Sequence, residues 1–464
     1  MNVQAELIGA QTRGPRGLAG RHLQLMGMGG AIGAGFLLGS GSAIHSAGAG
    51  LLLTYLLAGA AMYLMMRALG EVALTDPTAS SFSTYAMRYL GPLAGFITGW
   101  SYWVAAILVG MAEITAVGIL LRHWDPDIPQ WMPAFIATVL IYAINMRPVR
   151  SFGEAEFWLA MIKVVTLLGV LVCGVAILCL HLGEVGRHAG IANLWTHGGF
   201  FPSGFSGALA ALPVVLFSFG GVEVLVLAAA ETDRPEQTLP RAIRGLFYRI
   251  LILYVGSLAI VMMLFPWNSL DPATSPFIVV LQRAGLPAAE NVLTFVAITA
   301  VLSAGNSVLF ASSRMLRALA STGQAPAWLR RTSPQGAPQL AVSASASAMA
   351  IGVVLNYLMP KKVLGDVMQM VGWFTLVVWA VIMLTHLAYR RALARGEAQG
   401  DALGVSFRLP GAPYSSWLVL ATIGFAAFGM VVRGNGALCL CILLAWFALL
   451  IFASRTAAGP KRRG

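Results

Sequence analysis

The chain has 464 residues, of which 58% are apolar and 10% are charged. A soluble domain typically carries about 25% charged residues, and a chain with so few could not cover its surface with polar side chains. This composition and the mean hydropathy of +0.78 exclude soluble enzymes, disordered tails and secreted disulfide scaffolds. They predict an all-α integral membrane protein with many spanning helices.

Hydrophobic runs divide the chain into segments of membrane-spanning length. Twelve helices of roughly 20 residues would use about 240 residues, which is close to the apolar total. No second domain is visible between them, and the longest interior polar stretch, 389–413, is expected to be a loop. We predict twelve transmembrane helices near 22–45, 48–69, 92–121, 131–146, 154–182, 204–231, 247–266, 288–313, 338–358, 364–388, 414–432 and 436–454.

The net charge is +12, which raises the question of nucleic-acid binding. The basic residues form short clusters between hydrophobic runs, as in the cytoplasmic loops of membrane proteins, so we expect no nucleic-acid partner. With the N-terminus inside, 23 of the 30 Lys and Arg residues fall on the cytoplasmic side, six fall outside, and Lys163 lies within a span. We therefore predict that both termini are cytoplasmic, with tails at 1–21 and 455–464. The basic tail at 455–464 is expected to contact anionic lipid headgroups.

The first span contains five glycines between positions 27 and 35, and each costs up to about 1 kcal/mol in a helix relative to alanine. One interpretation is close helix packing, because Gly29 and Gly33 form a GxxxG pair, as do Gly35 and Gly39. The other is a local unwinding that exposes backbone N–H and C=O groups to a ligand. Irregular backbone is tolerated in a membrane where it lines a cavity.

The sixth span has a counterpart, Phe217-Ser-Phe-Gly-Gly-Val-Glu223, with Pro213 one turn earlier. A glycine pair beside a membrane glutamate is hard to explain by packing alone. The first and sixth spans are five apart and so enter the membrane from opposite sides. Interruptions at corresponding places in two inverted five-span halves indicate a transporter's binding site. We therefore predict that spans one and six are broken there.

Two broken helices at one site suggest what the ligand is. The half-helix that begins near Ala34 would direct free N–H groups and a positive dipole end at the break, which suits a carboxylate. The carbonyls freed near Met28 and Phe217 would suit an ammonium group. A site with both features fits a zwitterion, so the expected substrate is an amino acid.

Three ionisable residues, Glu113, Lys163 and Glu223, lie well inside predicted spans, where a functional role is the first hypothesis. Lys163 lies about nine residues, or ~14 Å, into span five, near the middle of a ~30 Å core and too deep to reach either interface comfortably. Burial favours its neutral form. Lys163 could therefore gain and lose a proton in each cycle, taking the place of a sodium ion. The alternative for all three is a buried ion pair or a side chain that reaches the interface.

The other candidates keep two interpretations. Glu223 could face the substrate amine or carry a proton, or it could bind free N–H groups of its own interrupted helix. Glu113 could equally be structural or functional. Five aromatic side chains could wall a pocket: Trp100, Tyr102, Trp103, Phe217 and Phe219. For the three in span three, Trp100, Tyr102 and Trp103, packing or lipid contact is favoured.

The sequence shows no metal-ligand spacing, phosphate loop or nucleophile elbow, and no cluster of His, Asp, Ser or Cys at one membrane depth. We therefore expect no metal, no cofactor and no enzymatic activity.

Several segments resemble bacterial amino-acid permeases of the amino acid–polyamine–organocation superfamily, and in particular the subgroup for proline, aromatic amino acids, histidine, GABA and D-serine, alanine and glycine. The resemblance covers 16 to about 455. It rests on Arg21-His-Leu-Gln-Leu25 with Gly29-Gly-Ala-Ile-Gly33, Met66-Arg-Ala-Leu-Gly-Glu71, Phe152-Gly-Glu-Ala-Glu-Phe-Trp158 with Ile162-Lys163, Phe217-Ser-Phe-Gly-Gly-Val-Glu223, Pro235-Glu-Gln-Thr-Leu-Pro240 and Ser313-Arg-Met-Leu316.

The resemblance implies a five-plus-five inverted repeat of the leucine-transporter type, with repeats at 22–182 and 204–388 and two accessory spans at 414–454. It also implies proton coupling at Lys163 and a lid at Phe217. Glu223 and Glu113 are further candidates for proton coupling because of their position inside the spans. The implied substrate-binding residues are Ile32, Gly33, Ala34 and Gly35 for the carboxylate, Phe217, Ser218 and Phe219 for the amine, and Ser303 and Asn306 as neighbours.

Two residues depart from the family pattern. Ala34 stands where many relatives have Thr or Ser, and Ala49 replaces a frequent proline. No acidic residue other than Glu113 and Glu223 is expected near the site, which favours neutral or aromatic substrates over dibasic ones.

The leading hypothesis is a bacterial inner-membrane permease that imports a neutral amino acid, aromatic, proline-like or histidine-like, by proton symport with alternating access. The alternatives are an obligate amino-acid exchanger and a non-transporting amino-acid receptor. Expected partners are the amino acid, protons and the lipid bilayer.

Overall fold

The computed structural model describes residues 18–76, 81–232, 234–272, 274–283, 287–334, 336–398, 407–432 and 436–457. Within these ranges the chain is almost entirely helical and contains no strand, and an isolated bridge joins Leu18 to Thr232. Residues 1–17 and 458–464 of the two predicted tails lie outside the described ranges.

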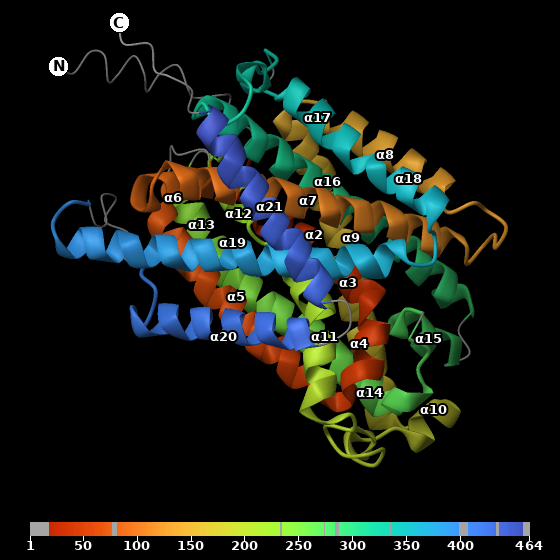
Figure 1. Ribbon diagram of the computed structural model, residues 1–464. Helices are drawn as coiled ribbons and strands as arrows, with labels where there is room; N and C mark the ends of the chain where they lie inside the picture. The colour runs from red at the N-terminus through yellow and green to blue at the C-terminus, as the bar shows by residue number, and fades with distance from the viewer. Residues whose placement is uncertain are drawn as a thin grey trace, which may run out of the picture.

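The first half of the chain forms helices that fall at the first five predicted segments, with short additional helices between them (Figure 1). In chain order they are α2 (Gly20–Ala31), α3 (Ala34–Leu37), α4 (Gly39–Ala47), η1 (Gly48–Gly50), α5 (Leu51–Ala73), α6 (Phe82–Leu90), α7 (Pro92–Leu121), α8 (Trp131–Asn145), α9 (Val149–Leu180), α10 (Gly183–His188) and η2 (Ile191–Leu194).

The second half follows the same pattern. Its helices are α11 (Gly204–Phe219), α12 (Val224–Ala229), α13 (Pro235–Leu251), the π-helical turn η3 (Ile252–Gly256), α14 (Ser257–Leu264), η4 (Trp267–Ser269), α15 (Pro276–Arg283), α16 (Pro287–Ser321), η5 (Ala327–Arg330), α17 (Gln339–Met349), α18 (Ile351–Leu358), α19 (Val363–Ala394), α20 (Tyr414–Val432) and α21 (Gly436–Ala457).

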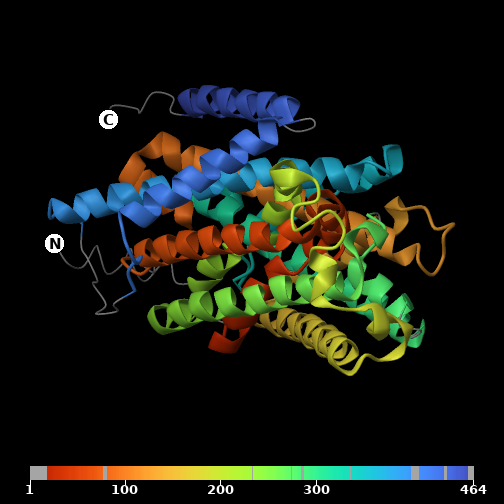
Figure 2. The same cartoon turned by 90° about the horizontal axis from the view of Figure 1, so that it is seen from below.

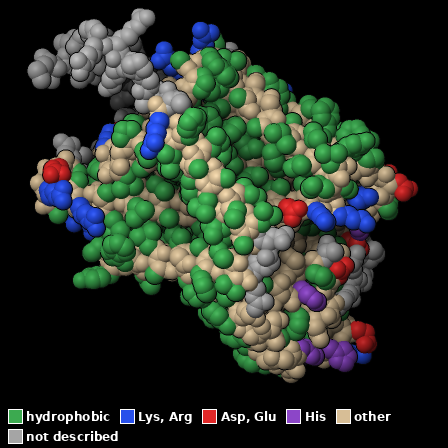
Figure 3. Space-filling model, viewed as in Figure 1, with side chains coloured by type: hydrophobic (Ala, Val, Ile, Leu, Met, Phe, Trp, Pro, Cys, Tyr) green, Lys and Arg blue, Asp and Glu red, His purple; other side chains and the backbone are tan. Residues whose placement is uncertain are grey.

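Length and composition make ten helical segments of the described chain able to cross a membrane, and α8 is a shorter apolar helix. One of the ten, Gly39–Ala73, joins α4 to α5 through Gly48, whose φ of 58° and ψ of −144° lie outside helical geometry. Figure 3 shows hydrophobic side chains over most of the visible face, with Lys, Arg, Asp and Glu mainly toward its two ends. The chain is a multi-pass helical membrane protein.

Burial is uneven among these helices. In α7 and in the α11–α12 segment, 78% of the most apolar window is buried, whereas the values for α9 and α21 are 28% and 22%. The α7 helix packs against α16 and α19, and α21 lies on the outside of the bundle (Figure 2). The interior around α7 is therefore the place where buried polar groups need a structural or functional explanation.

One buried polar cluster joins the end of α5 to the segment before α20. Glu71 is 6% exposed and accepts hydrogen bonds from the backbone N–H of Leu409 (2.6 Å) and from the ring of His386 (3.1 Å). It also forms an ion pair with Arg390 (3.2 Å). The other ring nitrogen of His386 lies 3.1 Å from the hydroxyl of Ser416. The Glu71 carboxylate therefore links α5, α19 and α20.

We expect Glu71→Ala to lower the free energy of unfolding by about 3 kcal/mol, because removing one partner of a buried ion pair leaves the other charge uncompensated. Thermal unfolding of the purified protein measures the change. The matched control is Glu184→Ala, because Glu184 pairs with Arg187 on the surface and such pairs contribute little. Equal unfolding temperatures for the two variants would contradict the prediction.

Candidate substrate and proton site

Two helix interruptions lie in the interior of the bundle. The α2 helix ends at Ala31 and α3 begins at Ala34, and Ile32 between them has φ of −83° and ψ of 90°. The α11 helix ends at Phe219 and α12 begins at Val224. Gly221 in this second gap has φ of 92°, a conformation that favours glycine.

Glycines allow the two interruptions to touch. A Cβ added at Gly30 would lie 2.9 Å from the carbonyl oxygen of Gly221, and one added at Gly221 would lie 3.0 Å from the carbonyl oxygen of Gly30. The hydroxyl of Tyr254 lies within hydrogen-bonding distance of the carbonyls of Ala31 (2.7 Å) and Ser218 (3.0 Å). The backbone on each side of the contact is therefore held by the same tyrosine.

Lys163 lies on α9 and is 1% exposed. Its ammonium group donates to the carbonyls of Gly29 (2.6 Å), Ile32 (3.1 Å) and Ala300 (3.4 Å). Two of these carbonyls belong to the end of α2, where the helix dipole favours positive charge. The three donors of one ammonium group therefore tie α2, α9 and α16 together.

Glu113 on α7 is 2% exposed and lies at the start of α3. Both of its carboxylate oxygens accept the backbone N–H of Ala34, at 3.1 and 2.9 Å. A Cβ at Gly33 would lie 2.2 Å from one of these oxygens, so glycine makes room for the carboxylate. Glu113 thus occupies the Ala34 N–H that the sequence assigned to a substrate carboxylate.

A fourth buried ionisable residue is Glu156 on α9, which is fully buried. Its oxygens accept hydrogen bonds from the hydroxyl of Ser303 (2.6 Å) and the amide of Asn306 (3.0 Å), both on α16. Asn145 on α8 donates to the side-chain oxygen of Asn306 (2.8 Å). A Cβ at Gly29 would lie 2.1 Å from Glu156 Oε1, so Gly29 approaches Glu156 as well as Lys163.

The expectation that no acidic residue besides Glu113 and Glu223 lies near the site is therefore wrong. The predicted fifth span begins at 154, which places Glu156 at the membrane edge. The helix begins at Val149, so Glu156 lies two turns inside it and seven residues before Lys163. This spacing puts both side chains on the same face of α9.

We expect Glu156→Gln to lower the free energy of unfolding by about 1–3 kcal/mol, because the amide nitrogen replaces one acceptor of a buried hydrogen-bond pair. Denaturant unfolding of the purified protein measures this loss. Glu397→Gln, at an exposed position, is the control and should leave stability unchanged. A Glu156→Gln protein as stable as the control would show that Ser303 and Asn306 do not need the carboxylate.

Glu223 lies directly after the second interruption and is 3% exposed. One oxygen accepts the indole N–H of Trp379 (2.7 Å) and the other accepts the backbone N–H of Gly221 (3.2 Å). The bond to Gly221 is the one that the structural interpretation of Glu223 anticipates. The bond to Trp379 connects the interruption to α19.

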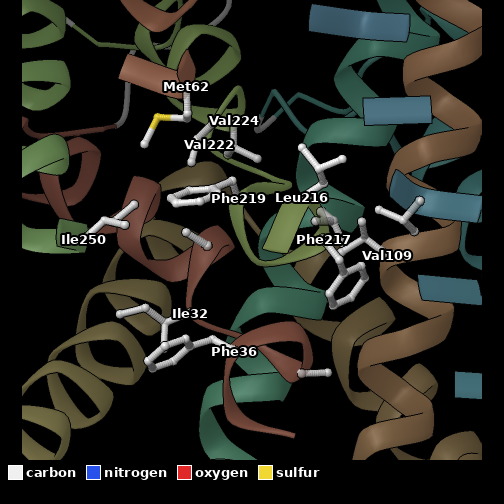
Figure 4. Packing of buried hydrophobic residues seen from close by; sticks show 14 of the residues in the cluster. Ile32, Phe36, Met62, Val109, Leu216, Phe217, Phe219, Val222, Val224 and Ile250 are labelled. Carbon is white, nitrogen blue, oxygen red and sulfur yellow. The ribbon is translucent and has the colours of Figure 1, made fainter. Parts of the chain in front are cut away.

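Aromatic side chains flank the second interruption on opposite sides. Phe217 points toward Val109 on α7, whereas Phe219 points toward Met62 and Val222 (Figure 4). The ring of Phe217 packs on Gly35, because a Cβ there would lie 2.0 Å from Phe217 Cδ1. Phe217 therefore covers the start of α3.

Ser218 joins the second interruption to α5. Its hydroxyl donates to the carbonyl of Val214 (2.8 Å) and lies 3.0 Å from the hydroxyl of Tyr55.

The span-three aromatics differ from one another. The indole of Trp100 donates to the carbonyl of Gln324, and that of Trp103 donates to the hydroxyl of Ser345. Tyr102 lines a small cavity beside the second interruption. Packing therefore accounts for Trp100 and Trp103, and Tyr102 faces the site.

The cavity that Tyr102 lines lies between α7, α16, α19 and the second interruption. Most of its wall is apolar, and its polar side chains come from Tyr102, Thr375 and Glu223. The apolar side chains that line it are Ala105, Ala106, Val109, Val308 and Val378. In the described part of the chain, His, Cys, Asp and Glu form no group of three that could hold a metal ion.

The structure brings most of the predicted site residues together. Ile32, Gly33, Ala34 and Gly35 form the α2–α3 junction, which Phe217 covers and Lys163 and Glu113 contact. Ser303 and Asn306 contact Glu156. Four residues at the site were not predicted from the sequence: Tyr254, Tyr55, Trp379 and Asn145. Tyr55, Trp379 and Asn145 lie in apolar α-helices and Tyr254 lies in the π-helical turn η3, and none has a local sequence signal. Glu156 was also not predicted as a site residue, although it belongs to a motif already singled out.

Comparison with known proteins supplies the family. The profile of a family described as Amino acid permease matches residues 22–453. The uncharacterized amino acid permease YtnA of Bacillus subtilis is 41% identical over 455 residues, which cover 97% of each chain. The aromatic amino acid transport protein AroP of Escherichia coli is 40% identical over 452 residues, which cover 96% of this chain and 97% of AroP.

A further relative is the probable threonine/serine transporter YbxG of Bacillus subtilis, which is 38% identical over 439 residues covering 94% of each chain. These relatives are named permeases or transporters, not enzymes. The matches extend over nearly the whole chain and include both interruptions. The chain belongs to the amino acid permease family.

Proposed function

We propose that this protein is a secondary active permease that imports a neutral amino acid together with protons. The observation that carries the proposal is the ammonium group of Lys163, which bonds to carbonyls of the interrupted α2 and of α16. When the ammonium group loses its proton it loses both its charge and one of its three donors. Proton release therefore weakens the link between α2, α9 and α16 and permits α2 to move.

The proposed substrate site is the contact between the two interruptions. The substrate carboxylate binds the N–H groups of the segment from Ile32 to Gly35, and the amine binds carbonyls of the segment from Phe217 to Phe219. Glu113 holds the Ala34 N–H in this structure, so substrate and Glu113 compete for the same donor. Phe217 acts as the lid. Ser303 and Asn306 act through Glu156, with which they are hydrogen-bonded.

The proposed coupling groups are Lys163, Glu113 and Glu223, and we add Glu156 because it is buried beside them. One ammonium group and three carboxyl groups lie buried around the interruptions. Binding or release of a single proton changes the net charge of this site. Because the dielectric constant is low there, that change alters the electrostatic energy of the site more than it would in water.

The proposed architecture has twelve spans in two inverted five-span repeats, 22–182 and 204–388, with two accessory spans at 414–454. Among the ten segments with full spanning length, Gly39–Ala73 contains both α4 and α5. In the proposed architecture α2–α4 is the first span, α5 is the second, and the shorter helix α8 is the fourth. Access alternates through rearrangement of α2–α3 and α11–α12 against the remaining helices. Both termini face the cytoplasm, and the protein lies in the bacterial inner membrane.

The proposed substrate class rests on the cavity between α7, α16 and α19. Its apolar wall favours a neutral side chain, and Thr375 and Tyr102 supply hydroxyl groups. The names of the relatives point to aromatic amino acids for AroP and to threonine or serine for YbxG, at nearly equal identity to this chain. We propose a neutral amino acid, with aromatic, proline-like and histidine-like members as candidates, and the name of YbxG adds hydroxylated ones.

Uptake by purified protein in proteoliposomes tests the function. A labelled panel of proline, phenylalanine, tyrosine, tryptophan, histidine, serine, threonine and lysine is measured under an inward proton gradient, a sodium gradient and neither. We expect accumulation of one neutral member with the proton gradient alone. Uptake that requires preloaded amino acid would establish an exchanger, and binding without uptake would establish a receptor. Either result would overturn the proposal of proton symport.

A further inference from the structure

A second cavity lies away from the interruptions, on the side of the molecule formed by α5, α11, α19 and α20. It contains about 610 Å³ of space that no protein atom fills, part of it open to the surroundings, and its lining is almost entirely apolar. Leu57, Phe205 and Phe425 stand at its mouth and are 59%, 58% and 48% exposed. Its inner wall includes Leu216 and Trp379, which are buried. The cavity is a groove that penetrates the bundle from its lipid-facing side.

We infer that this groove binds one acyl chain of a bilayer phospholipid. The helices that form it are among the segments able to cross a membrane, so its mouth faces hydrocarbon. The groove offers water molecules almost no hydrogen-bond partners, so water does not bind there stably. If the groove stays empty, the atoms of its wall lack dispersion contacts on one side. An acyl chain restores those contacts and is as apolar as the leucines that line the groove.

The length of the groove fits one leaflet. It extends along α11 from Phe205, at the start of the helix, to Leu216, just before the interruption. Eleven residues at 1.5 Å each span about 16 Å, and half of a ~30 Å hydrocarbon core is ~15 Å. A chain that enters at the Gly204 end of α11, with its headgroup at the interface, therefore ends beside the interruption.

Small side chains make the groove concave. Ala58 on α5, Ala208 on α11 and Ala426 on α20 line it, and each is at most 7% exposed. The rings of Phe205 and Phe425 lie 5.8 Å apart at its mouth. A larger residue at Ala58 or Ala208 would fill the space that the acyl chain takes.

The acyl chain also contacts the wall of the transport site. Trp379 lines the groove, and its indole donates to Glu223 beside the second interruption. A filled groove keeps the Trp379 ring against Glu223. This binding site stands on the membrane fold alone and does not depend on proton coupling.

Photolabelling tests the inference. Protein is reconstituted in vesicles of phosphatidylethanolamine and phosphatidylglycerol that contain a phosphatidylethanolamine with a diazirine in its acyl chain. After illumination, mass spectrometry compares labelled peptides of α5, α11 and α20 with the peptide around Val172, an exposed position on α9. We expect the groove peptides to be labelled about tenfold more strongly, which corresponds to about 1.4 kcal/mol of preference.

Filling variants make the test specific. Ala208→Phe and, as an independent variant, Ala58→Phe should lower groove labelling to the level of the α9 peptide. Val172→Phe adds the same ring on the α9 surface and should leave the labelling of the groove peptides unchanged. Equal labelling of the groove and α9 in the unaltered protein would overturn the inference, as would unchanged labelling in both filling variants. If the groove peptides are not labelled and cross-linking instead joins two copies of the chain through α20, a second copy occupies the groove. That result would also overturn the inference.

Discussion

Replacing Lys163 with alanine is expected to abolish accumulation driven by a pH gradient while leaving substrate binding in place. One pH unit corresponds to about 1.4 kcal/mol and can sustain about tenfold accumulation when one proton accompanies each substrate. The variant lacks the ammonium group that contacts Gly29, Ile32 and Ala300. The substrate concentration inside vesicles that contain this variant should therefore rise only to the external concentration.

Three measurements separate coupling from damage to the fold. Substrate-dependent thermal stabilisation reports binding, counterflow reports exchange, and uptake under an imposed pH gradient reports accumulation. Lys163→Gln keeps two hydrogen-bond donors without a titratable charge, so it should bind and exchange but fail to accumulate. Lys361→Ala, in an exposed turn, should behave like the unaltered protein. Full accumulation by Lys163→Ala would remove this residue from the coupling mechanism.

Replacing Gly221 with alanine is expected to destabilise the protein at the contact between the two interruptions. The φ of 92° at Gly221 is unfavourable for a residue with a Cβ, at a cost of about 1–3 kcal/mol. The added Cβ would also lie 3.0 Å from the carbonyl oxygen of Gly30. Because that oxygen is fixed in the backbone of α2, the two interruptions must separate, and transport should fall with stability.

The control for Gly221→Ala is Gly424→Ala on α20, where a Cβ would have no atom within 4 Å. That variant removes a helix glycine and should keep or slightly raise stability. Fluorescence-detected unfolding and proteoliposome uptake are measured for both. An unfolding temperature for Gly221→Ala equal to that of the unaltered protein would falsify the close contact between the interruptions.

Hydropathy predicted helix positions well where a hydrophobic run has sharp ends. The predicted segments 92–121 and 414–432 have the bounds of α7 and α20. It failed for polar helical extensions. The α13 helix begins at Pro235, twelve residues before the predicted span, because proline at the first helical position and an amphipathic pattern sustain a helix without hydrophobicity. The short helix α6 was missed because it, too, is amphipathic and its hydrophobic run is too short to span a membrane.

The parts of the site that could be predicted from the sequence are those that contain glycine segments or charged residues within apolar runs. Glycine segments lie where α2 and α11 end, and Glu113, Lys163 and Glu223 stand out as charges in apolar runs. Glu156 was not predicted to lie inside the bundle because its depth in the membrane depends on where α9 begins. Tyr254 and Trp379 were not predicted because the sequence around an aromatic residue in an apolar segment does not indicate a hydrogen bond to a distant part of the chain.

The hydroxyl of Tyr254 has one hydrogen and two acceptors, the carbonyls of Ala31 and Ser218. A phenol donates a full hydrogen bond to one acceptor at a time, so the two carbonyls compete for it. If the end of α2 withdraws, the hydrogen passes wholly to Ser218, and if the end of α11 withdraws it passes to Ala31. The position of each interruption therefore affects the hydrogen bond that Tyr254 makes to the other.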